Sequence, residues 1–105
     1  MKHTTDLQKI ADYLDFDLED VEMLIGVFLE GAYENMQELK IAIDINNMQD
    51  IQKAAHAIKG SAANLTLMNI ADIAKDIEEN AKKTNTCDYA KKYEELKVLV
   101  ENIKI

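Results

Sequence analysis

His56, Lys59 and Gly60 stand close together in the stretch AAHAIKGSAANL, which covers residues 54–65. A neutral imidazole is a competent nucleophile near pH 7, because its unperturbed pKa is about 6.5. On a helix, Lys59 lies near enough to offset the charge of a phosphoryl group on the ring. Gly60 leaves open surface one turn beyond His56, although glycine costs about 1 kcal/mol relative to alanine within a helix. This spacing suits a phosphoryl carrier, and the alternative is an ordinary surface histidine.

Other site chemistries fit these residues less well. A di-metal helical bundle needs Glu-x-x-His pairs, but Lys53 stands three residues before His56, and His3 is the other histidine. Structural zinc requires several cysteines, and Cys87 is the single one. The sequence contains no phosphate-binding loop. A nucleophile pair of Cys87 and His56 lacks an orienting group. We therefore expect no metal and no cofactor.

The elements that must position His56 are helices. Apolar residues recur every three or four positions in five segments, at about residues 6–14, 18–45, 48–65, 69–81 and 88–103. His56 falls on the polar stripe of the third segment, so it should face solvent or a shallow groove. A threonine before the first segment, Asp17, Asn47 and Thr86 are expected to cap helices. Short joints favour antiparallel neighbours. The predicted fold is all-α, an antiparallel up-down four-helix bundle with a short additional N-terminal helix.

Composition bounds the class of protein. The 105 residues include no proline and only three glycines, and we expect one domain over residues 1–105. The net charge is −8, and all twelve basic residues are lysines. Neither nucleic acid nor a membrane surface is therefore an expected partner. The lone Cys87 and the lack of a signal peptide or membrane span indicate a cytoplasmic protein. Met1 and the compact length favour a free-standing protein over a domain of a larger kinase.

HAIKGSAANL, followed by MNIADIAKDIEENA, resembles the histidine-containing phosphotransfer (HPt) domain of bacterial two-component phosphorelays. The family motif, H-x-x-K-G-[SA]-[SA], is matched from His56 onward, and the resemblance covers nearly the whole chain. It implies that His56 is phosphorylated on Nε2, that Lys59 contacts the phosphoryl oxygens, and that Gly60 lets a receiver domain approach. Thr66 departs from the glycine or alanine that is usual ten residues after the histidine.

The resemblance also implies a role for the next helix. Glu78, twenty-two residues after His56, would accept a hydrogen bond from Nδ1–H, and Lys75, one turn earlier, would add positive charge near the phosphoryl group. The alternative for both residues is an ordinary solvated helix face. Met23 and Val27 widen the apolar stripe of the second segment, either as a docking patch or as a broad core face.

By this resemblance, the protein relays phosphoryl groups between aspartates, as a monomer. Its partners would be receiver domains of response regulators and of hybrid sensor histidine kinases. It would carry no kinase or phosphatase machinery, and the receiver would supply Mg²⁺. The alternative function is a helical adaptor that binds a receiver or kinase domain without being phosphorylated.

Overall fold

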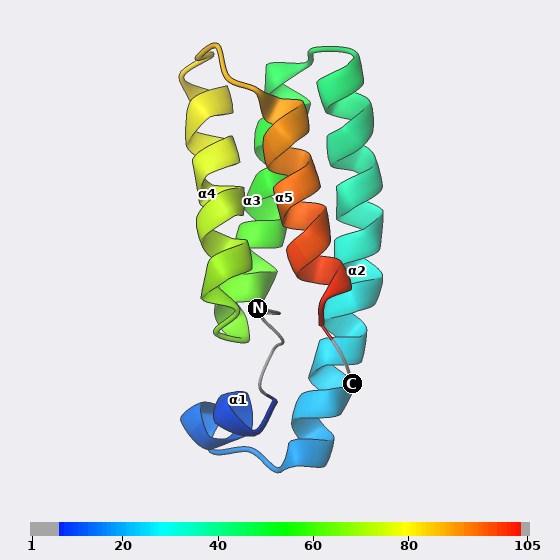
Figure 1. Cartoon of the computed structure of the whole chain (residues 1–105), viewed down its shortest axis with the longest axis vertical. Coiled ribbons are helices and arrows are strands. Elements are labelled where there is room, and N and C mark those ends of the chain that lie inside the picture. Colours follow the sequence, from blue (N-terminus) through cyan, green and yellow to red (C-terminus); the bar gives the residue numbers. More distant parts are fainter. Residues whose placement is uncertain (1–6, 104–105) are drawn as a thin grey trace.

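The computed structural model describes residues 7–103, which form five helices and no strand. The helices are α1 (Leu7–Leu14), α2 (Leu18–Asp44), α3 (Met48–Asn64), α4 (Met68–Lys82) and α5 (Tyr89–Glu101). Helices α2 to α5 lie side by side, and α1 packs against the end of α2 that extends beyond the others (Figure 1). The predicted all-α four-helix bundle with a short additional helix is confirmed, and the predicted helix boundaries within residues 7–103 hold to within two residues.

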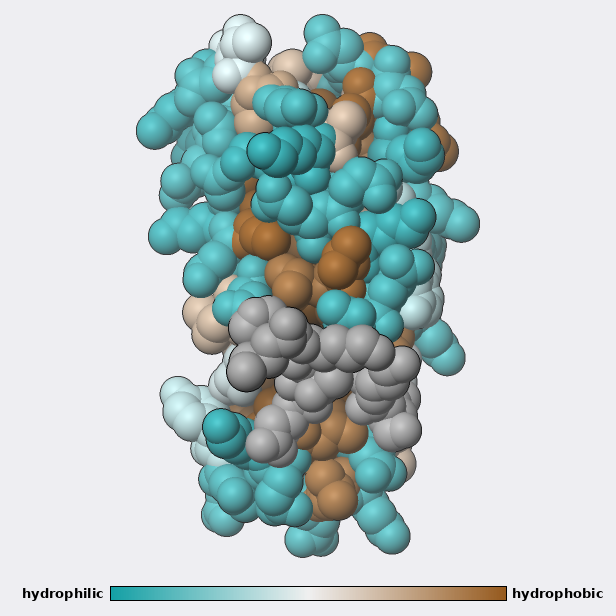
Figure 2. Space-filling view, in the orientation of Figure 1, coloured by the Kyte–Doolittle hydropathy of each residue, from teal (hydrophilic) through white to brown (hydrophobic). Residues whose placement is uncertain are grey.

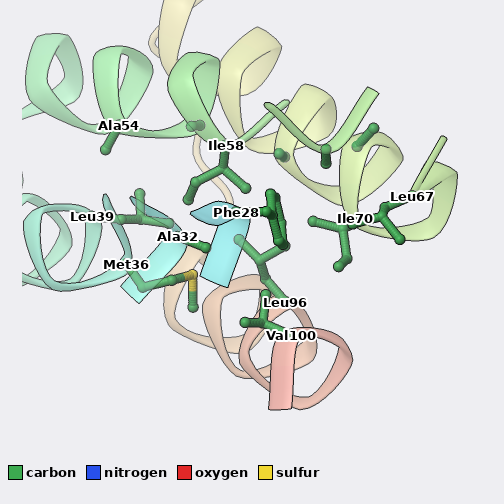
Figure 3. Packing of buried hydrophobic residues seen from close by; sticks show 14 of the residues in the cluster. Phe28, Ala32, Met36, Leu39, Ala54, Ile58, Leu67, Ile70, Leu96 and Val100 are labelled. Carbon is green, nitrogen blue, oxygen red and sulfur yellow. The ribbon is translucent and has the colours of Figure 1, made fainter. Parts of the chain in front are cut away.

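Apolar stripes from all five helices meet in one core. Phe28 of α2 lies between Ile58 of α3 and Ile70 of α4, with Leu96 and Val100 of α5 close by (Figure 3). Every buried residue of the described chain is apolar or a tyrosine. Burial of one large aliphatic side chain contributes about 1.5–3 kcal/mol, so the core fixes the rotation of each helix. The outer face shown in Figure 2 is mostly hydrophilic.

The rotation of α3 decides where His56 lies. Ile51, Ala55, Ile58 and Ala62 of α3 are almost completely buried. His56 is on the opposite side of the helix, and 66% of its side chain is exposed. The expectation that His56 faces solvent is therefore confirmed. Helix α3 makes its most extensive contacts with α4, which runs back along it after a short turn.

Side chains at the helix starts agree with the sequence in part. Asn47 caps α3, where its side chain accepts a hydrogen bond from the backbone N–H of Asp50 at 3.1 Å. Asp17 occupies the cap position of α2, but its side chain makes no capping bond. The prediction of Thr86 as the α5 cap is wrong. Asp88 caps that helix and accepts from Lys91 N–H at 3.0 Å, since it directly precedes the first helical residue. The threonine proposed before α1 lies outside the described residues.

The first four helices end in the same left-handed turn. One residue just beyond each of these helices has positive φ, and these residues are Asp15, Asn46, Thr66 and Thr84. After α3, Thr66 N–H donates to the carbonyl of Ala63 and Leu67 N–H to that of Ala62, which satisfies the terminal carbonyls. The φ of Thr66 is 58°, a conformation that glycine adopts without strain. This geometry explains why glycine suits the position where this chain has threonine.

Candidate functional site

His56 and Glu78 form a hydrogen-bonded pair between two adjacent helices. The antiparallel packing of α3 on α4 places His56 Nδ1 2.6 Å from Glu78 Oε2. An ionised carboxylate only accepts hydrogen bonds, so the imidazole tautomer that satisfies this contact carries its hydrogen on Nδ1. The lone pair of Nε2 is then available on a ring that is 66% exposed. The arrangement presents a nucleophilic nitrogen to solvent.

Lys59 completes a three-residue cluster with the same carboxylate. Its Nζ donates to Glu78 Oε1 at 2.6 Å, so the two oxygens of Glu78 bind two different side chains of α3. His56 and Lys59 are three residues apart and lie on one side of the helix. Only 13% of the Glu78 side chain is exposed. Glu78 is therefore the fixed centre of the cluster, with His56 at its exposed edge.

The electrostatics of Glu78 follow from this position. Burial alone raises the pKa of the Glu78 carboxyl, because a charged group is less well solvated there. Hydrogen bonds from Lys59 and His56, together with the positive charge on these partners, outweigh burial and hold the pKa below its ordinary value. Glu78 is thus ionised at neutral pH and remains a hydrogen-bond acceptor.

Gly60 and Lys75 lie near this cluster without being bonded to it. A Cβ atom added at Gly60 would lie in open space, so nothing within the described chain requires glycine there. Lys75 is exposed on α4, one turn before Glu78. Within residues 7–103, Lys75 makes no hydrogen bond or ion pair. The structure thus brings together His56, Lys59 and Glu78, and Lys75 remains a nearby charge.

Several large apolar side chains of α1, α2 and the joint between them are exposed. Met23 and Val27 are exposed on α2, so they do not belong to a widened core face. Tyr13 at the end of α1 and Phe16 in the following joint are exposed as well, and sequence periodicity did not single them out. Their signal was the presence of aromatic residues within the acidic stretch DYLDFDLED. Met23 and Val27 are one turn apart on α2, and exposed apolar side chains on one helix face suit protein contact.

Residues 7–103 contain neither a candidate membrane-spanning helix nor a candidate metal site. None of the helices combines the length and apolar composition needed to cross a bilayer. Between Leu7 and Ile103, no three His, Cys, Asp or Glu side chains gather in a way that would bind a metal ion.

Comparison with known proteins places this geometry in context. A family model described as "Hpt domain" matches residues 23–104. The match includes the α3–α4 pair with all three clustered side chains. No curated protein and no solved structure matches the chain.

Proposed function

Because the chain belongs to the Hpt domain family, we propose that it relays a phosphoryl group between receiver-domain aspartates through His56. The observation that carries the proposal is the 2.6 Å contact between His56 Nδ1 and Glu78 on an otherwise exposed ring. This contact leaves Nε2 as the free nucleophile. The family supports phosphotransfer in general, and the geometry supports His56 as the acceptor.

The proposed transfer moves one phosphoryl group and no proton on Nδ1. The Nε2 lone pair attacks the phosphorus of an aspartyl phosphate on the receiver, and the P–O bond breaks with its electron pair on the carboxylate. The ring then carries a P–Nε2 bond and positive charge, which Glu78 stabilises through the Nδ1–H bond. In onward transfer, a carboxylate oxygen of the second receiver's aspartate attacks the phosphorus, and the P–Nε2 bond breaks with its electron pair on Nε2, so that a neutral imidazole leaves. Glu78 acts throughout as a positioning residue.

Lys59 would change partners during this cycle. Its flexible ammonium group binds Glu78 in the unphosphorylated protein, and the three terminal oxygens of a phosphoryl group on His56 would provide a second acceptor. Lys75 would contribute longer-range positive charge. By resemblance, the receiver supplies Mg²⁺ and its acidic pocket, and this chain supplies the histidine. We expect the apolar surface around Met23 and Val27 to contact the receiver.

The test is transfer from a phosphorylated receiver domain to the purified protein. We expect acid-labile, base-stable phosphate on the wild-type chain, as a phosphohistidine requires. His56→Gln should abolish it, and His3→Gln, at the other histidine, should not. Equal labelling of wild type and His56→Gln would reject the relay role.

The alternative is a helical adaptor that binds a receiver or kinase domain and never becomes phosphorylated. It predicts binding that is saturable in wild type and in His56→Gln, with no phosphate transferred to either. The hydrogen-bonded cluster of His56, Lys59 and Glu78 favours the relay, because an adaptor has no need of an oriented nucleophile.

A further inference from the structure

A second candidate interaction surface lies between α2 and α3, on the side of His56 away from Glu78. It is a shallow groove whose lining residues are Asn35, Glu38, Ile41, Ala42, Asp50, Lys53, Ala54 and Ala57. Lys53 precedes His56 by one turn and Ala57 follows it, so the groove borders the proposed phosphorylation site. The cluster with Glu78 uses none of these residues.

The floor of the groove is apolar and is formed by short side chains. Ala42, Ala54 and Ala57 have side chains short enough for another backbone to come close to both helices. Ile41 forms one wall, and 61% of it is exposed. Ile45, four residues further on at the C-cap of α2, is 63% exposed. Two aliphatic side chains are thus left in water beside an alanine-lined groove, which is the shape that receives the apolar face of a helix.

The rim of the groove is acidic. Glu38 stands on the α2 side and Asp50 on the α3 side, and Lys53 is the single cation among the lining residues. Neither carboxylate forms an ion pair or accepts a hydrogen bond within the described part of the chain. They are therefore available to a partner.

Negative charge elsewhere in the chain adds to that of the groove rim. Residues 1–50 contain twelve of the twenty acidic residues and three of the twelve lysines, and most of this excess negative charge lies on α2 and on the joint before it. The remaining residues are close to neutral. A basic partner approaching the α2 side of the bundle is attracted over a Debye length of about 8 Å at physiological salt.

We propose that the α2–α3 groove binds an amphipathic helix of a partner protein, with apolar residues on the groove floor and Lys or Arg toward Glu38 and Asp50. Apolar area supplies attraction, and the acidic rim selects a basic helix over a neutral or acidic one. This inference does not depend on phosphoryl transfer, because its test measures binding alone.

The probe is a fluorescent synthetic helix of about 18 residues, roughly 27 Å long, with Leu on one face and Lys on the flanking positions. A matched peptide carries Glu in place of each Lys. Fluorescence anisotropy with the full chain should show saturable binding of the Lys peptide only. Increasing NaCl from about 0.05 M to about 0.5 M should weaken this binding.

Variants of exposed residues locate the bound peptide. Glu38→Gln with Asp50→Asn should raise the Kd about fivefold or more. Glu94→Gln with Glu95→Gln, on exposed positions of α5, changes the net charge equally and should leave the Kd within about twofold. In the same way, Ile41→Gln should weaken binding and Val98→Gln, also exposed on α5, should not. Circular dichroism checks that each variant is folded.

Two outcomes would overturn the proposal. One is no saturable binding of the Lys peptide to the wild-type chain. The other is an equal loss of affinity in the groove variants and in their α5 counterparts, which would mean general attraction to an acidic protein. Loss confined to the groove variants would support it, whether or not His56 is ever phosphorylated.

Discussion

Replacing Glu78 by glutamine should destabilise the protein at neutral pH and leave it nearly unaffected in acid. Hydrogen bonds to charged groups are worth about 1.5–3 kcal/mol each, and Glu78 accepts two, from His56 and Lys59. Burial of the carboxylate opposes this gain, and solvent screens the mostly exposed His56. We therefore expect a loss of about 1 kcal/mol in the free energy of unfolding at pH 7, or about 4–8 °C in Tm.

The pH dependence follows from the direction of the pKa shift. The pKa of Glu78 is lower in the folded chain than its ordinary value of 4.5, so the unfolded chain binds its proton more readily. The stabilisation is complete above the unfolded pKa and is lost as the pH falls through the folded pKa. The difference between wild type and Glu78→Gln should thus shrink as the pH drops below about 4.5.

Urea unfolding followed by circular dichroism, at several pH values from 7 to below 4, measures this difference. The other carboxylates titrate in both proteins, so the difference between the two free energies of unfolding at each pH reports on residue 78. Glu79→Gln, at the adjacent exposed position, is the control and should match wild type. A Glu78→Gln effect that is absent at pH 7, or that is the same at every pH, would refute the interpretation of Glu78 as an ionised bridge.

Three further predictions concern residues outside this bridge. Gly60→Ala should raise the free energy of unfolding by about 0.5–1 kcal/mol, since the added Cβ has open space. Gly60→Gln should slow phosphoryl transfer from a receiver, and equal transfer rates in this variant and in wild type would exclude a docking role for Gly60. Thr66→Gly should stabilise the chain by about 1 kcal/mol in urea unfolding, because the positive φ at this position strains a β-branched residue, and a loss of stability would contradict this. Met23→Gln with Val27→Gln should raise the receiver concentration needed for half-maximal transfer, while Val98→Gln should not; identical transfer curves would exclude Met23 and Val27 from docking.

The sequence predicted the helices well because their apolar stripes are regular. Ile51, Ala55 and Ile58 recur at helical spacing, so the orientation of α3 and the exposure of His56 followed from the periodicity alone. The cap of α5 was assigned to the wrong residue, because Thr86 and Asp88 are both good capping residues. The choice between them depends on the residue at which the α4–α5 joint ends and the helix begins, and local composition does not determine this residue.

The candidate site was less accessible to sequence reasoning. The spacing of His56 and Lys59 puts them on one helical face, but the partnership with Glu78 needs the register of α4 against α3. That register depends on the left-handed turn at Thr66 and on packing of the two stripes. The α2–α3 groove was not predicted, because its alanines resemble core positions in the sequence and its shape exists only between two helices.

The whole His56–Lys59–Glu78 cluster belongs to one helical hairpin, α3–α4, closed by a single short turn. The imidazole and the carboxylate that orients it are thus separated by only 22 positions along the chain. Contacts of such short range form early and cost little loop entropy. Fraying of α1 or α5 is a sub-global event that need not disturb this hairpin. The proposed chemistry of the protein thus depends on two adjacent helices, and α1 and α5 contribute no side chain to the cluster.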